Sequence, residues 1–332
     1  MKPHILMLTK TFDPHVHPVA EALQRRNVSL IRFDLADFPQ RIQLAARIGG
    51  DAEGWQGPLT FHGQTHDLAD IASIWYRRPT HTVIPRSYSP PVRDFLALEN
   101  LRGFVGILHG PFWVSPRGAI QAAEFKPAQL QAAQALGLRI PRTLITNDPA
   151  TVLAFFEECE GAMISKAVAR GVVDPEGSLL RDQPRFLHTS KVERDHLEEE
   201  QVEGVRACAH LFQELIPKAM DLRVTVIGRQ LFTVGIQTQS EVSALDWRRG
   251  YDTLTYTRER LPVEIEQKLF HLVRRFGLQF SSADFMLTPE GEYVFVELNP
   301  NGQFYFLVPP TGLPMAEAMA DLLCAPEDYC LC

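Results

Sequence analysis

Three polar side chains near the end of the chain have the types and the spacing of a metal site. Glu297 and Asn299 stand two positions apart on a predicted strand, so their side chains face the same way. Asp284 lies on the preceding predicted strand, and a short hairpin would turn it toward the other two. Three oxygen ligands suit Mg²⁺, which takes its remaining ligands from water and phosphate. The alternative is a polar network beside a turn, because residues 299–302 are Asn-Pro-Asn-Gly.

Three basic residues stand where phosphate ligands would be expected. Lys126 precedes a proline at a predicted helix start, and Lys166 ends a predicted strand just before residues 169–187, for which we predict a mobile loop. Arg223 lies on a predicted strand with an alternating charged face, from which a guanidinium could brace a transferring phosphoryl group. A single lysine at a strand end is more often a solvated surface group, so the residues alone leave both interpretations open.

A further candidate contact is the segment 213–218. Glu214 supplies an acidic side chain, and the backbone around Ile216, just before Pro217, is expected to be exposed. A segment of this kind could bind the edge of an adenine base.

The elements that must position these residues begin with an α/β unit. Strands and helices alternate in the first part of the chain, which predicts a parallel sheet with helices on its faces. Proline and glycine cluster at 110–118 and mark its end. The predicted strands are residues 5–8, 28–33 and 71–76, and the predicted helices are residues 16–26 and 94–108.

The rest of the chain changes from mixed α and β to a mainly β pattern. Hairpin turns are expected at 228–230 and at 288–291. The acidic run 193–203 is expected to form an exposed helix rather than a site. The predicted strands are 143–146, 162–167, 211–216, 222–227, 231–237, 253–256, 282–287 and 293–298, and the other predicted helices are 122–135, 149–161, 262–276 and 314–323.

Composition excludes several classes of protein. The 332 residues carry a formal net charge of −7, and a mildly acidic chain argues against a general nucleic-acid binder. No apolar stretch approaches the roughly 18 residues of a transmembrane helix, and the apolar run at 5–8 is too short for a signal peptide. The five cysteines are an odd number without zinc-site spacing, which predicts a reduced, cytoplasmic protein.

Taken together, the candidate residues resemble the ATP-grasp superfamily, in which two lobes hold ATP between them. The resemblance covers nearly the whole chain. Four stretches narrow it to the graspetide synthetases, the microviridin-type maturases that cross-link a ribosomal peptide. These stretches are residues 32–39, 75–79, 246–248 and 297–303.

The resemblance implies a role for each candidate residue. Lys166 and Arg223 are implied to be catalytic, with Arg223 stabilising an acyl phosphate and the tetrahedral intermediate formed from it. Asp284, Glu297 and Asn299 are implied to hold two Mg²⁺ ions. The implied ATP-binding residues are Lys126, Lys166, Glu214, Ile216 and Arg223.

The resemblance also implies a fold, a reaction and partners. The fold class is α/β and α+β: an ATP-grasp fold with an N-terminal pre-ATP-grasp domain at 1–115, a central lobe at 116–200 and a C-terminal lobe at 201–332. The implied reaction activates Asp or Glu side chains of a precursor peptide and links them to Thr, Ser or Lys as ω-esters or ω-amides. The partners are the leader and core of that peptide and a second copy of the chain, with no nucleic acid and no membrane. The leader is expected on segment 231–256 and the helix after Pro262.

Some features leave alternatives open. Phe304 stands where many relatives have Trp, and Ser281-Ser282 precede Ala283 where Gly-Ala is common, which leaves the substrate preference open. Arg77 and Arg78 could contact a core carboxylate or form structural salt bridges. The competing functions are a carboxylate–amine ligase of the glutathione-synthetase or glutamate-ligase type and a non-catalytic ATP-binding protein.

Overall fold

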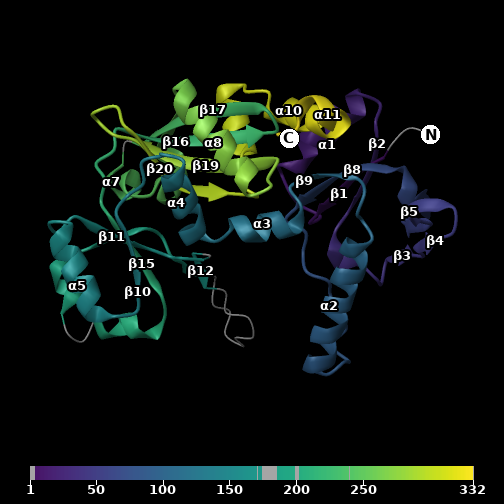
Figure 1. The fold of residues 1–332 in the computed structure, drawn as a ribbon, viewed down its shortest axis with the longest axis horizontal. Coiled ribbons are helices and arrows are strands. Elements are labelled where there is room, and N and C mark those ends of the chain that lie inside the picture. Colours follow the sequence, from purple (N-terminus) through teal and green to yellow (C-terminus); the bar gives the residue numbers. More distant parts are fainter. Residues whose placement is uncertain (1–3, 170, 174–184, 199–201, 239, 332) are drawn as a thin grey trace.

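The computed structural model describes residues 4–169, 171–173, 185–198, 202–238 and 240–331. Figure 1 shows three lobes: an N-terminal α/β domain, a smaller central lobe, and a C-terminal lobe built on one large sheet. Among the described residues, no helix is long and apolar enough to cross a membrane.

The N-terminal domain has the predicted parallel sheet, in the order β2-β1-β8-β9. Its central strand is buried on both faces, which explains the unbroken apolar run at 5–8. The domain also contains a part that we did not predict: residues 42–67 form short antiparallel strands beside the sheet. The elements are β1 (His4–Thr9), α1 (Val16–Arg25), β2 (Ser29–Phe33), β3 (Ile42–Leu44), β4 (Arg47–Gly49), β5 (Ala52–Gln56), β6 (Pro58–Phe61), β7 (Gln64–Asp67), β8 (Ile71–Arg77), α2 (Pro90–Gly106) and β9 (Phe112–Val114).

Two helices stand where a single one was predicted over 122–135. They are α3 (Arg117–Ala123) and α4 (Lys126–Ala135). The prediction of one helix is wrong because Pro127 cannot donate a backbone hydrogen bond, so a helix cannot run through it from Glu124. Phe125 is extended instead, and α4 starts afresh at Lys126. This break fixes Lys126 at a helix N-terminus.

The central lobe is an antiparallel sheet in the order β10-β15-β11-β14, with α5 beside it. Because β15 pairs with β10 and β11, the sheets favour a boundary after β15 rather than at residue 200. The predicted loop 169–187 has only its ends in the described structure, where β12 and β13 pair; the remainder lies outside the described residues. The elements are β10 (Thr143–Thr146), α5 (Pro149–Glu158), β11 (Met163–Lys166), β12 (Val172–Val173), β13 (Arg185–Phe186), β14 (Ser190–Val192) and β15 (His210–Glu214).

The acidic run predicted to be one exposed helix is not one helix where it is described. It begins as a 3₁₀ turn, Arg194–Leu197, and a second 3₁₀ turn covers Glu203–Ala207, while 199–201 lie outside the described residues. Leu197 and Val205 are buried, so these turns pack an apolar side against the central lobe.

The C-terminal lobe is a five-stranded antiparallel sheet in the order β18-β17-β16-β19-β20. Figure 1 shows α8 lying across this sheet, and α10 meets α1 of the N-terminal domain. Both predicted hairpins are present, and Gly228 takes the positive φ of 53° that the first turn requires. The elements are β16 (Met220–Ile227), β17 (Gln230–Thr238), α7 (Glu241–Ala244), β18 (Leu254–Glu259), α8 (Val263–Arg275), β19 (Phe280–Leu287), β20 (Tyr293–Asn299), α9 (Val308–Thr311), α10 (Met315–Cys324) and α11 (Pro326–Tyr329).

The cysteines differ from the prediction of an entirely reduced chain. Cys159, Cys208 and Cys324 are free thiols, and Cys159 is buried in the central lobe. Cys330 is disulfide-bonded, so the prediction is wrong at that position.

Candidate functional site

The central and C-terminal lobes enclose a cavity of about 930 Å³. Its walls come from β11 and β15 on one side and from β16, β19 and β20 on the other. Every candidate site residue of the sequence lines this cavity. They are Lys126, Lys166, Glu214, Ile216, Arg223, Asp284, Glu297 and Asn299.

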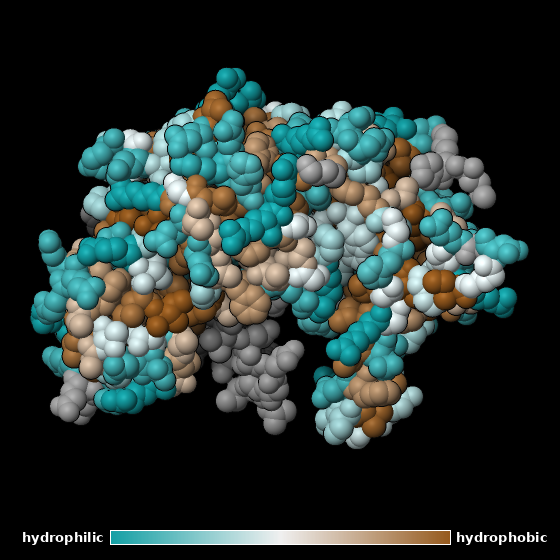
Figure 2. Space-filling model, in the orientation of Figure 1, coloured by the Kyte–Doolittle hydropathy of each residue, from teal (hydrophilic) through white to brown (hydrophobic). Residues whose placement is uncertain are grey.

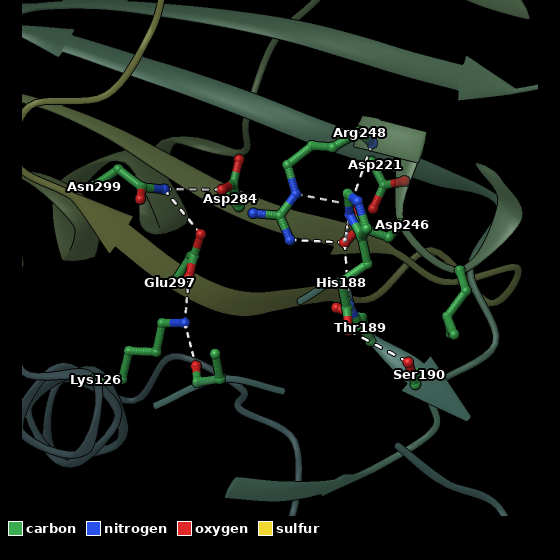
Figure 3. A network of polar contacts seen from close by, with 12 residues as sticks. Lys126, His188, Thr189, Ser190, Asp221, Asp246, Arg248, Asp284, Glu297 and Asn299 are labelled. Atoms are coloured by element: carbon green, nitrogen blue, oxygen red, sulfur yellow. Dashed lines mark hydrogen bonds and ion pairs between the residues drawn. The ribbon is translucent and has the colours of Figure 1, made fainter. Parts of the chain in front are cut away.

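The three oxygen-bearing side chains on β19 and β20 form one cluster. Asp284 pairs with Glu297 in the strand register, which places both carboxylates on the same face of the hairpin. The Asn299 Nδ2 donates hydrogen bonds to Asp284 Oδ2 at 3.0 Å and to Glu297 Oε1 at 3.1 Å. Figure 3 shows the three side chains converging. The predicted convergence of these residues is therefore present.

Two cations contact this cluster, one at each carboxylate. The Arg223 Nη1 donates to both carboxylate oxygens of Asp284 at 2.7 Å, and its Nη2 donates to the carbonyl of Gln303 at 3.1 Å. The Lys126 Nζ lies 3.4 Å from Glu297 Oε2 and donates to the carbonyl of Ala167 at 2.8 Å. Lys126 thus joins the start of α4 and the end of β11 to the acidic cluster.

Burial and neighbouring charges shift the pKa values of the two carboxyl groups in opposite directions. Burial raises the pKa of Asp284, although Arg223 acts against it. Burial also acts to raise the pKa of Glu297, but Lys126 and the Asn299 hydrogen bond outweigh it and lower that pKa. Two carboxylates this close favour a bound cation, because a cation relieves their mutual repulsion.

The donor set of the cluster fits Mg²⁺ bound together with a phosphate. The cluster offers two carboxylates and one amide, and among the described residues no group of three or more Asp, Glu, His or Cys side chains converges. A dedicated cage for a free ion would need more protein ligands. Mg²⁺ usually takes one or two carboxylates and completes its shell with water and phosphate oxygens, which is the arrangement these residues allow.

Lys166 is not the solvated surface group of the alternative interpretation. It ends β11, lines the cavity, and burial lowers its pKa to about 8, against the opposing effect of Glu297. An ammonium group held in a cavity near an acidic cluster is placed to meet an anion.

The other end of the cavity is apolar and carries the predicted adenine contacts. The Glu214 carboxylate accepts hydrogen bonds from the Arg142 N–H at 2.9 Å and Nε at 2.6 Å, so the side chain is already held. The buried Ile216 follows on the connection from β15 to β16. The apolar side chains beside it are Pro141, Ile164, Met286 and Val296.

Two ion pairs in the cavity were not predicted from the sequence. Lys218 and Asp221 form an ion pair at 2.6 Å, and Asp246 binds Arg248. The sequence drew attention to the stretch 246–248, but it did not indicate that Asp246 contacts Arg248. These pairs line the cavity next to the acidic cluster.

Arg77 ends β8 and Arg78 follows it, and the two arginines have different surroundings. Arg77 is 1% exposed; its Nη1 donates to the Asn301 carbonyl and its Nε lies 3.7 Å from Asp13 Oδ2. For Arg77 the structural interpretation is therefore the right one. Arg78 has a positive φ of 48° and lines the cavity, so the N-terminal domain contributes a cation to it.

Comparison with known proteins identifies the family to which this chain belongs. A family model described as the MvdD pre-ATP grasp domain matches residues 4–121. The solved macrocyclase MdnB from Microcystis aeruginosa MRC is 32% identical, with 97% of this chain and 99% of MdnB covered and a TM-score of 0.76. The chain belongs to the graspetide synthetases. The predicted ATP-grasp fold with its N-terminal pre-ATP-grasp domain, and with it the prediction of an ATP-grasp ligase, is confirmed.

Two further solved graspetide-synthetase relatives were determined with ligands. Macrocyclase MdnC from M. aeruginosa MRC, bound with precursor peptide MdnA, is 28% identical, with 97% of this chain and 99% of MdnC covered and a TM-score of 0.82. A Chryseobacterium gregarium RiPP-associated ATP-grasp ligase, in complex with ADP and a leader and core peptide, is 26% identical, with coverage of 98% and 97% and a TM-score of 0.86. A comparison with curated protein sequences gives no match.

Proposed function

We propose that this graspetide synthetase uses ATP to activate Asp or Glu side chains of a ribosomal precursor peptide and then forms ω-ester or ω-amide cross-links within that peptide. The observation that carries the proposal is the acidic cluster of Asp284, Glu297 and Asn299, enclosed by Lys126 and Arg223 in a cavity between two lobes. A cavity that holds both carboxylates and basic side chains suits a polyanion bound together with a cation. The ligand-bound MdnC and C. gregarium enzymes support the peptide substrate.

The nucleotide would lie along the cavity with its base in the apolar end. We assign the adenine contacts to Glu214 and Ile216 and the phosphate contacts to Lys126 and Lys166. Asp284, Glu297 and Asn299 would hold Mg²⁺, two ions in our proposal, which supplies positive charge to the phosphate oxygens. The donor set described above supports this assignment.

The first chemical step is phosphoryl transfer to the peptide carboxylate. A carboxylate oxygen of the peptide attacks the γ-phosphorus, the bond between the β,γ-bridging oxygen and the γ-phosphorus breaks, and ADP leaves. The product is an acyl phosphate, a better electrophile than a carboxylate. Lys166 and Arg223 contribute by holding the reacting groups in place and by countering the negative charge.

The second step closes the ring. The hydroxyl of a Thr or Ser, or the amine of a Lys, attacks the acyl carbon, phosphate leaves, and the nucleophile's proton passes to the released phosphate. Arg223 would stabilise the oxyanion of the tetrahedral intermediate. Gly171 and Leu187, from the two sides of the β12–β13 pair, line the cavity and would help to exclude the water that otherwise hydrolyses the acyl phosphate.

The partners follow from exposed surfaces. We propose that the leader peptide docks along β17, β18 and α8; β18 is an edge strand, which leaves backbone groups free for a peptide. We also propose a homodimer, because Val92, Phe95 and Leu98 are exposed on the projecting helix α2 (Figure 2, lower right). Light scattering tests the dimer, and a monomeric mass would contradict it. We place the reaction in the cytoplasm, where ribosomal peptides are made.

The test is peptide mass after incubation with ATP and Mg²⁺. We expect a candidate precursor to lose one water mass per ring and to stimulate ADP release. Asp284→Asn should lower the rate by about 100-fold or more, because the cluster loses a charged ligand. The matched control is Asp51→Asn, an exposed residue in the turn between β4 and β5 and outside the cavity, which should retain wild-type activity. A gain of mass on a peptide or amine would instead indicate a carboxylate–amine ligase and contradict the proposal.

A further inference from the structure

The tetrapeptide Asp-Leu-Ala-Asp occurs twice in the N-terminal domain, at 34–37 and at 67–70. Each copy forms a 3₁₀ turn whose first aspartate is the N-cap. The backbone is nearly the same at both caps, with φ and ψ of −94° and 141° at Asp34 and of −86° and 138° at Asp67. The two turns share one local structure, so any further contact of one cap comes from its surroundings.

The two capping aspartates differ in those further contacts. Asp67 is exposed, and its Oδ1 accepts from the Ala69 N–H at 2.9 Å and from a second backbone N–H at 3.2 Å. Asp34 is buried, and its Oδ1 lies 3.4 Å from the Ala36 N–H but only 2.7 Å from the Thr80 N–H. The Oδ2 of Asp34 accepts from the Thr80 hydroxyl, also at 2.7 Å. The carboxylate of Asp34 is therefore bound more closely to Thr80 than to the turn that it caps.

Asp34 and Thr80 lie at the same edge of the parallel sheet. β2 ends at Phe33 and β8 ends at Arg77, and both strands run parallel to β1, which lies between them. The side chain of Asp34 thus connects the segment after β2 to the segment after β8. Ligand sites of open parallel sheets are found at this carboxyl edge.

Arg78 is held between two fixed neighbours. On one side, the buried Arg77 donates to the Asn301 carbonyl. On the other side, two residues along the chain, Thr80 is bound by Asp34. Arg78 itself has a positive φ of 48°, a conformation that persists in a residue other than glycine only where the surroundings hold it. The contact between Asp34 and Thr80 therefore helps to fix the backbone that carries the Arg78 side chain.

Arg78 is the residue through which the N-terminal domain reaches the cavity. Among the described residues that line the cavity, it alone belongs to that domain. Burial lowers the pKa of Arg77 to about 9, against the effect of Asp13. The charges of Arg78 and Arg223 add to this lowering, so both guanidinium groups lie near the same buried side chain. Arg78 thus lies at the end of the cavity that holds Arg223.

We propose that Asp34 is a positioning residue, which holds Arg78 in place to bind a carboxylate of the precursor peptide. This assignment rests on the proposed function. The nucleotide contacts assigned above all come from residues after 125, so a cation from the N-terminal domain is available to the second substrate, whose reacting group is a carboxylate. A guanidinium binds a carboxylate through two parallel hydrogen bonds. Because the backbone of Arg78 is fixed beforehand, less conformational entropy is lost when the peptide binds.

The KM values for peptide and for ATP distinguish this role from a phosphate contact. Arg78→Ala should raise the KM for the peptide by about tenfold or more, the effect of losing a charged hydrogen bond, with the KM for ATP unchanged. The matched control is Arg47→Ala, at an exposed position on β4 and outside the cavity, which should leave both KM values at wild type. An unchanged peptide KM in Arg78→Ala, or a raised KM for ATP in its place, overturns the assignment.

The two Asp-Leu-Ala-Asp turns supply a matched pair of variants for Asp34. Asp34→Ala and Asp67→Ala each remove one N-cap, but only Asp34→Ala releases Thr80. Asp34→Ala should raise the peptide KM by about threefold or more, whereas Asp67→Ala should leave it at wild type. Thr80→Val removes only the hydroxyl donor at an exposed position and should raise the peptide KM in the same direction, which keeps the test valid if thermal unfolding shows that Asp34→Ala does not fold.

A double-mutant cycle distinguishes positioning from a general loss of structure. If Asp34 acts through Arg78, adding Asp34→Ala to Arg78→Ala should raise the peptide KM no further. An effect of Asp34→Ala that is equally large with and without the Arg78 guanidinium, or equal effects of the two cap variants, overturns the positioning role, while cross-linking by the wild type stands. If the wild type itself forms no cross-link, the proposed function fails, and this assignment fails with it.

Discussion

At the scale of single residues, Arg223 is the side chain whose geometry constrains the chemistry most. One guanidinium donates to both oxygens of Asp284 and to the carbonyl of Gln303. It therefore connects β16, β19 and the loop after β20 through one planar group. Charge alone would not require arginine here, but three acceptors in fixed directions do.

Replacing Arg223 with lysine tests the importance of this geometry. We expect Arg223→Lys to fold and to bind ADP, but to lose peptide-stimulated ADP release by about 100-fold or more, because an ammonium cannot reach all three acceptors. The matched control is Arg47→Lys at an exposed position on β4 and outside the cavity, which should retain wild-type rates. Retained activity in Arg223→Lys would show that only its charge matters.

At the scale of elements, the hairpin of β19 and β20 and the loop that follows it form the floor of the site. Alternation in the sequence was sufficient to predict this hairpin, because residues two apart on a strand share a face. What alternation could not predict is the closeness of the loop to the strand. A Cβ on Gly302 would lie 2.4 Å from the Cβ of Ser282 and 3.0 Å from the Arg223 Nη2.

Gly302→Ala should therefore disturb both the strand and the arginine. We expect the free energy of unfolding to fall by about 1–3 kcal/mol from overpacking, and the rate of ADP release to fall further than this loss explains. Gly103→Ala is the control, since a Cβ there meets open space on helix α2 and should be neutral or slightly stabilising. Urea unfolding and steady-state kinetics measure both effects, and wild-type behaviour of Gly302→Ala would contradict the close packing.

At the scale of the whole molecule, the residues predicted from the sequence are those with local signals. Lys126 beside a proline, Lys166 at a strand end and Glu297 with Asn299 each have a pattern within a few positions. The contacts of Asp246 with the segment at 188–189 span more than fifty positions and have no local pattern. The strands at 42–67 were missed for a related reason, because they are short and mostly exposed on one side.

The N-terminal domain is also coupled to the site over a long sequence distance. The buried His15 accepts hydrogen bonds at Nδ1 from the N–H groups of Phe304 and Tyr305, at 3.3 and 3.0 Å. These residues directly follow Gln303, whose carbonyl accepts from Arg223. A neutral imidazole in one domain thus fixes the loop that supports the arginine in another, and Nδ1 can accept only while it is unprotonated.

This dependence predicts a loss of stability in mild acid. Burial, followed by the charge of Arg77, lowers the pKa of His15 from 6.5 to about 4, although Asp13 acts against the shift; Arg78 and Arg223 add to it. Between these values the unfolded chain binds a proton that the folded chain does not, so stability falls as the pH drops from 6.5 toward 4. The contribution of this residue is about 3 kcal/mol.

The measurement is urea unfolding at pH 7 and at pH 4.5 for the wild type and for His15→Asn. The variant is less stable at pH 7, but it should lose less stability on acidification, because the other titrating groups are common to both proteins and cancel in the difference. His271→Asn, an exposed position on α8, should follow the wild-type pH dependence. Parallel curves for the wild type and His15→Asn would mean that the imidazole does not couple the N-terminal domain to the loop at Phe304, and the acid sensitivity of the fold would then have to arise elsewhere.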